Sequence, residues 1–161
     1  MEKKPIKRNE NIVKLSRDHH ASLLFCWKLR QGVKQHADVE RMIKYVSYFW
    51  TKHLAPHFTE EEKFLFAPIK DDKVQKAIDE HKKIKELINE LTVKGALERE
   101  SKLSRLADMV DEHVRYEERI LFPHLESELS GEQLKHIGTW ISDDPLLDTY
   151  EDAFWEKPVS L

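Results

Sequence analysis

The stretch His57-Phe-Thr-Glu-Glu-Glu-Lys-Phe-Leu-Phe66 returns, with five of its ten positions identical, as His113-Val-Arg-Tyr-Glu-Glu-Arg-Ile-Leu-Phe122. Matching positions lie 56 residues apart, and each copy places a histidine four residues before a glutamate. On a helix, side chains with this spacing stack on one face. Imidazole and carboxylate groups that converge from one face are ligands for first-row transition metals. The repeat therefore predicts two helices that face each other and hold two metal ions.

Composition limits the class of protein. The chain of 161 residues is long enough for one domain with a sizeable core, and its 4 glycines and 6 prolines leave the composition strongly helical. A net charge of −3 argues against nucleic-acid binding that rests on bulk electrostatics. No apolar run approaches the ~20 residues of a membrane span, so we expect no membrane partner.

Cysteine usage and the N-terminal residues favour the cytoplasm. The single cysteine, Cys26, excludes an intramolecular disulfide and fits a reducing compartment. Its apolar neighbours predict a small buried hydrophobic residue. The basic residues 1–8 are not followed by the apolar segment of a secretory signal. We therefore expect a cytoplasmic protein.

Apolar residues recur at steps of three and four through almost the whole chain, which predicts long amphipathic helices. Pro56 and Pro123 fall inside two of them and predict a kink or local break. Short connections between long helices favour an all-α, up-down-up-down four-helix bundle. The four helices are expected over about residues 11–33, 38–66, 72–94 and 96–129.

A shorter helix is expected over about residues 132–141, followed by a tail. We divide the chain into a bundle with this short helix, residues 1–142, and a C-terminal tail, residues 143–161. The tail carries several aromatic residues and is expected to fold back over the bundle. A segment that docks a partner protein is the alternative.

Polar residues on the apolar stripes need an explanation. Each long helix offers one inward histidine, and two helices add an inward glutamate. Burying these groups without compensation would cost several kcal/mol for each charge, and metal ions remove that cost. The predicted metal ligands are His19, His57, Glu61, His81, His113 and Glu117.

Other polar residues near this set are harder to assign. His53 lies one helical turn before His57 and is a possible fifth imidazole ligand, hydrogen-bond donor to a ligand or proton relay. His20 is a possible substitute for His19, and His36 a possible additional ligand near the end of the first helix. The acids beside the predicted ligands point about 100° away from them and are expected to be surface charge. These acids are Glu60, Glu62 and Glu118.

These residues resemble the hemerythrin-like family, also called the HHE cation-binding domain, over about residues 15–128. The motifs are Asp18-His19, His57-x-x-x-Glu61-Glu62 before Leu65-Phe66, Glu80-His81, and His113-x-x-x-Glu117-Glu118 before Leu121-Phe122-Pro123. The resemblance implies a four-helix bundle around two iron ions in a non-haem centre, with an oxo or hydroxo bridge. It implies that His19, His57, His81 and His113 are terminal ligands, and that Glu61 and Glu117 bridge the irons.

Two positions depart from the oxygen-carrying members of the family. The carriers have a second histidine four residues after the one on the third helix, where this chain has Lys85. Their last carboxylate is an aspartate five residues after the fourth-helix histidine, where this chain has Glu117 after four. Both departures resemble the bacterial and iron-sensing branches. The resemblance therefore favours other roles over simple oxygen carriage.

The ligand count supports this preference. Four histidines and two bridging glutamates supply about eight positions, a bridging oxygen adds about two, and two octahedral metals require about twelve. Roughly one position on each metal stays open. Such a site suits a small diatomic or peroxide ligand (O2, NO or peroxide), or the uptake and release of iron.

Three alternatives remain at the level of sequence. An enzyme that reduces peroxide or repairs nitrosylated iron centres is possible, but only Tyr116, beside Glu117, offers a candidate redox residue. A non-redox bundle with structural zinc is disfavoured, because six ligands exceed the four that such zinc takes. An interaction module would act through the tail residues 143–155. The protein partner and the choice between iron and manganese stay open.

Overall fold

The protein is described by a computed structural model over residues 7–144 and 146–157, and every regular element in these ranges is a helix. The predicted all-α class is therefore confirmed for this part of the chain. None of the helices in it is both long and apolar enough to cross a membrane. The elements are α1 (Val13–Lys34), α2 (Val39–Phe49), η1 (Trp50–Leu54), α3 (Ala55–Glu60), η2 (Glu61–Leu65), α4 (Asp72–Thr92), α5 (Arg99–Tyr116), η3 (Glu117–Leu121), α6 (Phe122–Glu128) and α7 (Gly131–Trp140).

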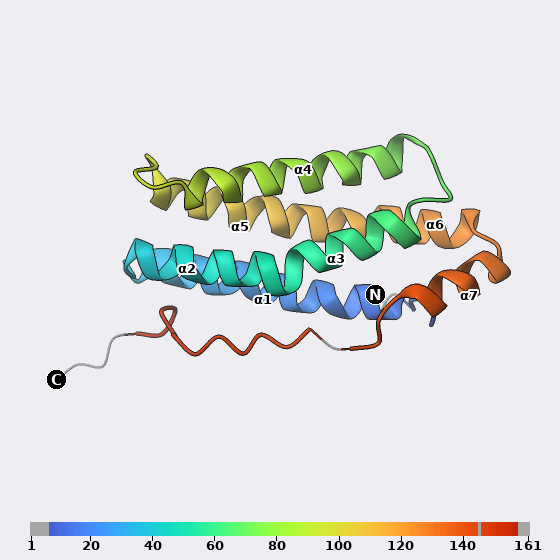
Figure 1. Ribbon diagram of the computed structural model, residues 1–161, viewed down its shortest axis with the longest axis horizontal. Coiled ribbons are helices and arrows are strands. Elements are labelled where there is room, and N and C mark those ends of the chain that lie inside the picture. Colours follow the sequence, from blue (N-terminus) through green and yellow to red (C-terminus); the bar gives the residue numbers. More distant parts are fainter. Residues whose placement is uncertain (1–6, 145, 158–161) are drawn as a thin grey trace, which may run out of the picture.

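The long elements form four helical rods that lie side by side, with successive rods running in opposite directions (Figure 1). The first rod is α1, the second runs from α2 to η2, the third is α4, and the fourth runs from α5 to α6. α5 packs against both α1 and α4, and α2 contacts α4. Polar side chains cap the N-termini of three helices. Asp38 and Asp71 accept backbone N–H bonds at the starts of α2 and α4, and Ser130 forms a capping box with Gln133 before α7.

Both internal prolines coincide with π-helical turns. Pro56 lies in the first turn of α3 directly after η1, and Pro123 lies in the first turn of α6 directly after η3. A proline lacks the N–H group of a regular turn and clashes with the carbonyl four residues earlier. A wider turn, in which the N–H bonds the fifth preceding carbonyl, accommodates both effects. The predicted local breaks are therefore turns of larger radius within continuous rods.

The connection between α4 and α5 is longer than predicted. α4 ends at Thr92, two residues before the expected end, and α5 begins at Arg99, three residues after the expected start. Gly95 has a φ of 81°, in the left-handed region that commonly ends helices, and Glu98, the residue before α5, has a φ of 55°. The predicted break at Gly95 between the two helices is therefore confirmed, whereas the positive φ of Glu98 was not predicted.

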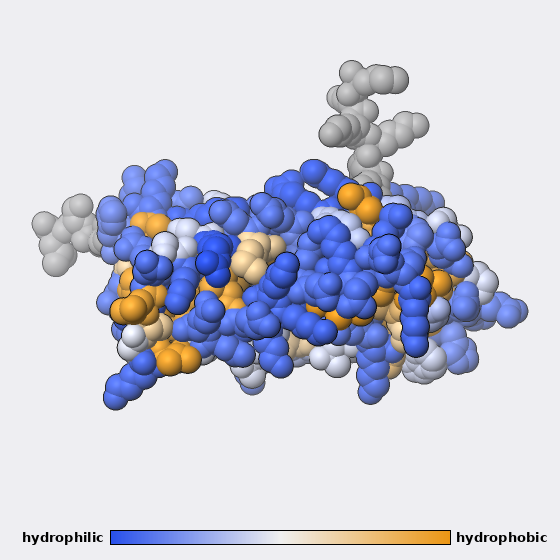
Figure 2. Space-filling model, turned by 90° about the horizontal axis from the view of Figure 1, so that it is seen from above, coloured by the Kyte–Doolittle hydropathy of each residue, from blue (hydrophilic) through white to orange (hydrophobic). Residues whose placement is uncertain are grey.

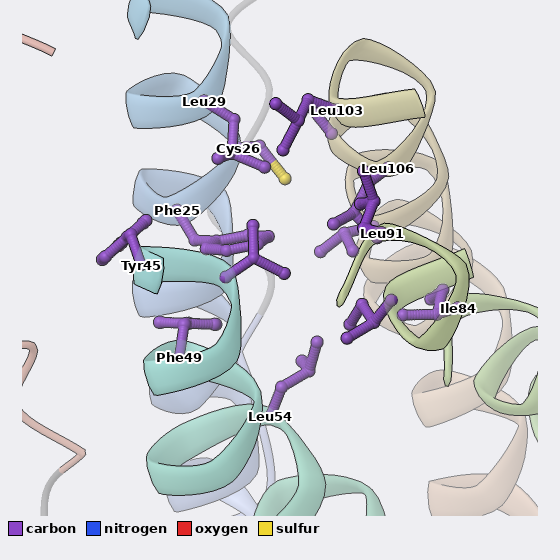
Figure 3. Packing of buried hydrophobic residues seen from close by; sticks show 14 of the residues in the cluster. Phe25, Cys26, Leu29, Tyr45, Phe49, Leu54, Ile84, Leu91, Leu103 and Leu106 are labelled. Carbon is purple, nitrogen blue, oxygen red and sulfur yellow. The ribbon is translucent and has the colours of Figure 1, made fainter. Parts of the chain in front are cut away.

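Apolar side chains form two separate clusters along the rods. One cluster lies toward the α1–α2 connection, where Phe25 and Leu29 lie across from Leu103 and Leu106 (Figure 3). The other lies toward α7 and includes Leu15, Leu65, Phe66, Leu121 and Phe122. The space-filling view shows a mostly hydrophilic face with scattered apolar residues (Figure 2). The gap between the clusters is where the predicted metal ligands lie.

The segment after α7 runs back along the first two rods in an extended form (Figure 1). Its Phe154 is 2% exposed and lies in the cluster that contains Phe25. Asp148 accepts hydrogen bonds from the hydroxyl of Tyr45 and from Nζ of Lys28, the latter at 3.0 Å. Residues 158–161 of the predicted tail lie outside the described residues.

Candidate metal centre

The structure brings all six predicted ligands together in the middle of the rods. His19 comes from α1, His57 from α3, His81 from α4 and His113 from α5, while Glu61 and Glu117 open η2 and η3. The side chains are buried, and both glutamates are completely inaccessible to solvent. They form two overlapping groups, in each of which one ligand atom per residue lies within 4.8 Å of the others. The groups are His19, His57, Glu61 and Glu117, and Glu61, His81, His113 and Glu117.

The two glutamates belong to both groups because each directs one oxygen to each pair of histidines. Glu61 Oε2 lies 3.4 Å from His19 Nε2 and 3.3 Å from His57 Nε2, while its Oε1 lies 3.2 Å from His81 Nε2. Glu117 Oε1 lies 2.8 Å from His19 Nε2, and its Oε2 lies 3.5 Å from His81 Nε2 and 3.3 Å from His113 Nε2. This is the arrangement that bridging carboxylates between two ions require.

Unsatisfied polar atoms show that the site fits metal ions. Nε2 of His57, His81 and His113 and three of the four glutamate oxygens are buried without a hydrogen-bond partner in the described part of the chain. Leaving such atoms unpaired is costly, and native proteins rarely do so. All of them point into the same space and are nitrogen or oxygen donors. Divalent first-row metals bind such donors, so a metal site is the physical explanation for their convergence.

Each histidine is oriented by a carboxylate on its outer nitrogen. With Nδ1 bonded to a carboxylate, the imidazole carries its proton there and turns the Nε2 lone pair inward. All four outer carboxylates come from a helix other than that of their histidine. The Nδ1–carboxylate pairs are His19 with Glu118 at 2.6 Å, His57 with Asp18 at 3.0 Å, His81 with Glu62 at 2.7 Å and His113 with Glu80 at 2.8 Å.

The expectation that Glu62 and Glu118 are surface charge is wrong. Their side chains are 39% and 26% exposed, and both bond histidines of the centre. An angle of 100° from the inward direction places a side chain at the boundary with the neighbouring helix, where it meets the histidine of that helix. The available signal was adjacency, because each outer acid directly precedes or follows a predicted ligand in the sequence. Glu60 also turns inward at the edge and accepts a hydrogen bond from Lys14.

The carboxylates also set the protonation of the centre. Burial lowers the pKa of His19, but hydrogen bonds to Glu117 and Glu118 outweigh this effect and raise the pKa well above its usual value, so a metal ion that binds there would displace the Nε2 proton. Burial likewise lowers the pKa of His81, but the nearby carboxylates, Glu117 and Glu61 first, outweigh this effect and raise the pKa well above its usual value. Burial raises the pKa of Glu118, yet the hydrogen bond from His19 leads the effects that lower it to about 2. Glu118 therefore stays ionised at neutral pH and can hold the outer proton of His19.

The additional histidines lie outside both groups. His20 is exposed on α1, and His36 is exposed beyond the end of that helix with a φ of 56°. His53 is buried, with Nε2 3.4 Å from the hydroxyl of Tyr48 and its ring 5.0 Å from Phe49. The hydroxyl of Tyr116 donates to the carbonyl of Lys73 at 2.6 Å. The structure therefore gives neither His20 nor His36 a place in the centre.

Comparisons with known proteins agree with this geometry. The profile of the Hemerythrin family, described as the hemerythrin HHE cation binding domain, matches residues 11–125. A DNA nickase from Nostoc sp. (strain PCC 7120) is 28% identical over 140 residues, which are 83% of this chain and 38% of that protein. The chain therefore spans well under two thirds of this relative's length. No solved structure matches the chain.

Proposed function

Because the chain belongs to the hemerythrin HHE cation-binding domain family, we propose that it is a non-haem di-iron protein that senses, binds or processes O2, NO or peroxide, or handles iron. The observation that supports two metals is that Glu61 and Glu117 each direct one oxygen to each histidine pair. We also interpret the four antiparallel rods as the up-down-up-down four-helix bundle expected for the family.

In this proposal the four histidines are terminal ligands, and the two glutamates hold the ions a few Å apart. Bound iron would supply redox chemistry and positions open to a small ligand. The chain fixes the orientation of the ligands and excludes water from the centre. The outer carboxylates hold each imidazole in one tautomer and raise its basicity, and the two apolar clusters exclude water from either side of the centre.

A non-redox divalent-metal bundle with zinc, acting as an interaction module, is the second candidate. It is favoured by the four protein donors in each group, which match the number that zinc binds. Against it, both carboxylates are shared between the groups, and none of the donors is a thiolate. Nitrogen and oxygen donors with shared carboxylates suit iron or manganese better.

We do not extend DNA nicking to this chain. The named relative is a DNA nickase, but most of that protein lies outside the matched region. The net charge of −3 provides no general attraction to nucleic acid.

The test is to purify the protein without oxygen, count metals per chain by elemental analysis, and record the absorption spectrum before and after adding O2. Two irons per chain and new near-ultraviolet charge-transfer bands of oxidised iron would support the proposal. Glu61→Ala and Glu117→Ala should each lose two-metal binding. One zinc per chain, or no metal in a folded protein, would contradict the proposal and favour the structural bundle.

A further inference from the structure

The two halves of the centre differ in what covers them. In the half formed by His19 and His57, buried cations neutralise the outer carboxylates. The side chain of Arg8 is 4% exposed, donates to Glu118 at 2.9 Å and lies over the ring of Phe122. The side chain of Lys14 is 9% exposed, and its Nζ lies 3.0 Å from Asp18. We call it the closed half, because buried cations pair with both of its outer carboxylates, although the side chain of Glu118 is 26% exposed.

The half formed by His81 and His113 lies beside a cavity. Its outer carboxylates include the most exposed of the four, Glu62 at 39%, while Glu80 at 24% matches Glu118 at 26%, and the lysine that pairs with Glu80 is itself 54% exposed. A pocket of about 490 Å³ lies between the second rod and α4. We call it the lysine pocket; residues that line it include Trp50, Phe58, Glu62, His81, Lys82 and Lys85.

Phe58 and His81 both line the lysine pocket, whereas His113 does not. The ring of Phe58 is stacked on His81 with the ring centroids 3.7 Å apart and an angle of 12° between the planes. Its edge-to-face distance to His113 is 5.5 Å. The matching position in the other copy of the repeat is Val114, and in the closed half the ring of Phe122 lies 5.2 Å from that of His19.

The charge of the lysine pocket selects the ligand. Lys63, Lys82 and Lys85 line it, all three are exposed, and within the described ranges none lies within 4 Å of a carboxylate. The carboxylate in the lining, Glu62, already accepts a hydrogen bond from His81 Nδ1. Three unpaired ammonium groups over the low-dielectric walls of Trp50 and Phe58 concentrate anions.

We propose that the lysine pocket binds a small inorganic anion and admits it past Phe58 to the His81–His113 half of the centre. This inference rests on the proposed di-iron function. The anion is held first by the lysine ammonium groups, and the phenyl ring controls its passage inward. The closed half takes no part in this route, because Arg8 and Lys14 occupy the corresponding space around its outer carboxylates.

The test uses azide as the probe and the oxidised, iron-loaded full chain. The association rate is followed by stopped-flow absorption at low and high salt, and metal content is measured on every sample. Lys85→Glu should slow association roughly tenfold at low salt and weaken its salt dependence. The matched control is Lys83→Glu, the same charge change on the same helix outside the lysine pocket, and its rate should stay close to that of the original protein.

Two further variants test the gate. Phe58→Ala, or Phe58→Leu if the alanine variant folds poorly, should raise the association rate while both irons are kept. Equal slowing by Lys85→Glu and Lys83→Glu, or an unchanged rate in a Phe58 variant that keeps its iron, would overturn the inference alone. Absence of iron from the original protein would overturn the proposed function and this inference with it.

Discussion

Substitution of Glu61 by glutamine separates a bridging role from ordinary ligation. Glutamate offers two oxygens, and in this protein Oε2 faces His57 at 3.3 Å while Oε1 faces His81 at 3.2 Å. Glutamine has almost the same shape but only one oxygen, and its NH2 group is a hydrogen-bond donor. The variant therefore keeps an oxygen ligand for one half of the centre and removes it from the other.

The size of the effect follows from the donor count. One group keeps its four protein donors, and the other falls from four to three. Loss of an outer hydrogen-bond partner already costs about 10- to 100-fold in metal affinity. Loss of a direct ligand should cost at least about 100-fold, or about 2.7 kcal/mol. We expect one tightly bound iron per chain in Glu61→Gln.

The assay is anaerobic equilibrium dialysis against buffered ferrous iron, with elemental analysis of the retained metal. Circular dichroism confirms that each variant is folded. Glu112→Gln is the matched control, because Glu112 is exposed on α5 and precedes His113 directly. Two irons bound to Glu61→Gln with the affinity of the original protein would refute the bridging geometry.

Three other outcomes are expected. Glu118→Gln, which replaces the outer carboxylate of one ligand, should weaken metal binding about 10- to 100-fold in dialysis, with an unchanged affinity as the contrary result. Gly32→Ala should destabilise the chain by about 1–3 kcal/mol in urea unfolding, because the new Cβ would lie 2.8 Å from Met42 Cε and 2.9 Å from the ring of Phe154. Phe154→Ala alone should cost about 3 kcal/mol. The double variant Gly32→Ala with Phe154→Ala should lose less stability than the sum of the two single variants, and strict additivity would contradict this packing. Burial raises the pKa of Asp148, but the hydrogen bond from Tyr45 leads the effects that lower it, so the folded pKa is depressed. The contribution of Asp148 to the free energy of unfolding should be complete above about pH 4 and lost as pH falls through the folded pKa. Tryptophan fluorescence should report release of the tail in that pH range.

The six inward polar residues were predictable because helical periodicity is a local property. The four-residue spacing of His57 and Glu61 fixes their common face in any α-helix, whatever surrounds it. The apolar residues around His19 and His81 fix the inward direction in the same way. Their assignment as metal ligands stays a prediction, which the metal counts described above decide.

The partners of those residues were not predictable from periodicity. Glu118 bonds a histidine 99 positions away, and Arg8 reaches that glutamate across 110 positions. Glu62 was expected in solvent because a helical wheel gives the direction of a side chain but does not show which neighbouring helix it meets. The residue that a side chain meets at 100° from the inward direction depends on how closely the rods pack and on their relative rotation.

The sequence thus determined the helical class, the inward histidines and glutamates, and the repeat that makes the centre two-fold. Only the tertiary structure decided which carboxylate orients which imidazole, and which half of the centre is closed by Arg8 and Lys14 or faces the lysine pocket. The physical reason is the sequence distance over which each kind of interaction acts. Periodicity acts over one or two turns of a helix, whereas hydrogen bonds and cavities between rods depend on residues that the chain brings together from distant positions.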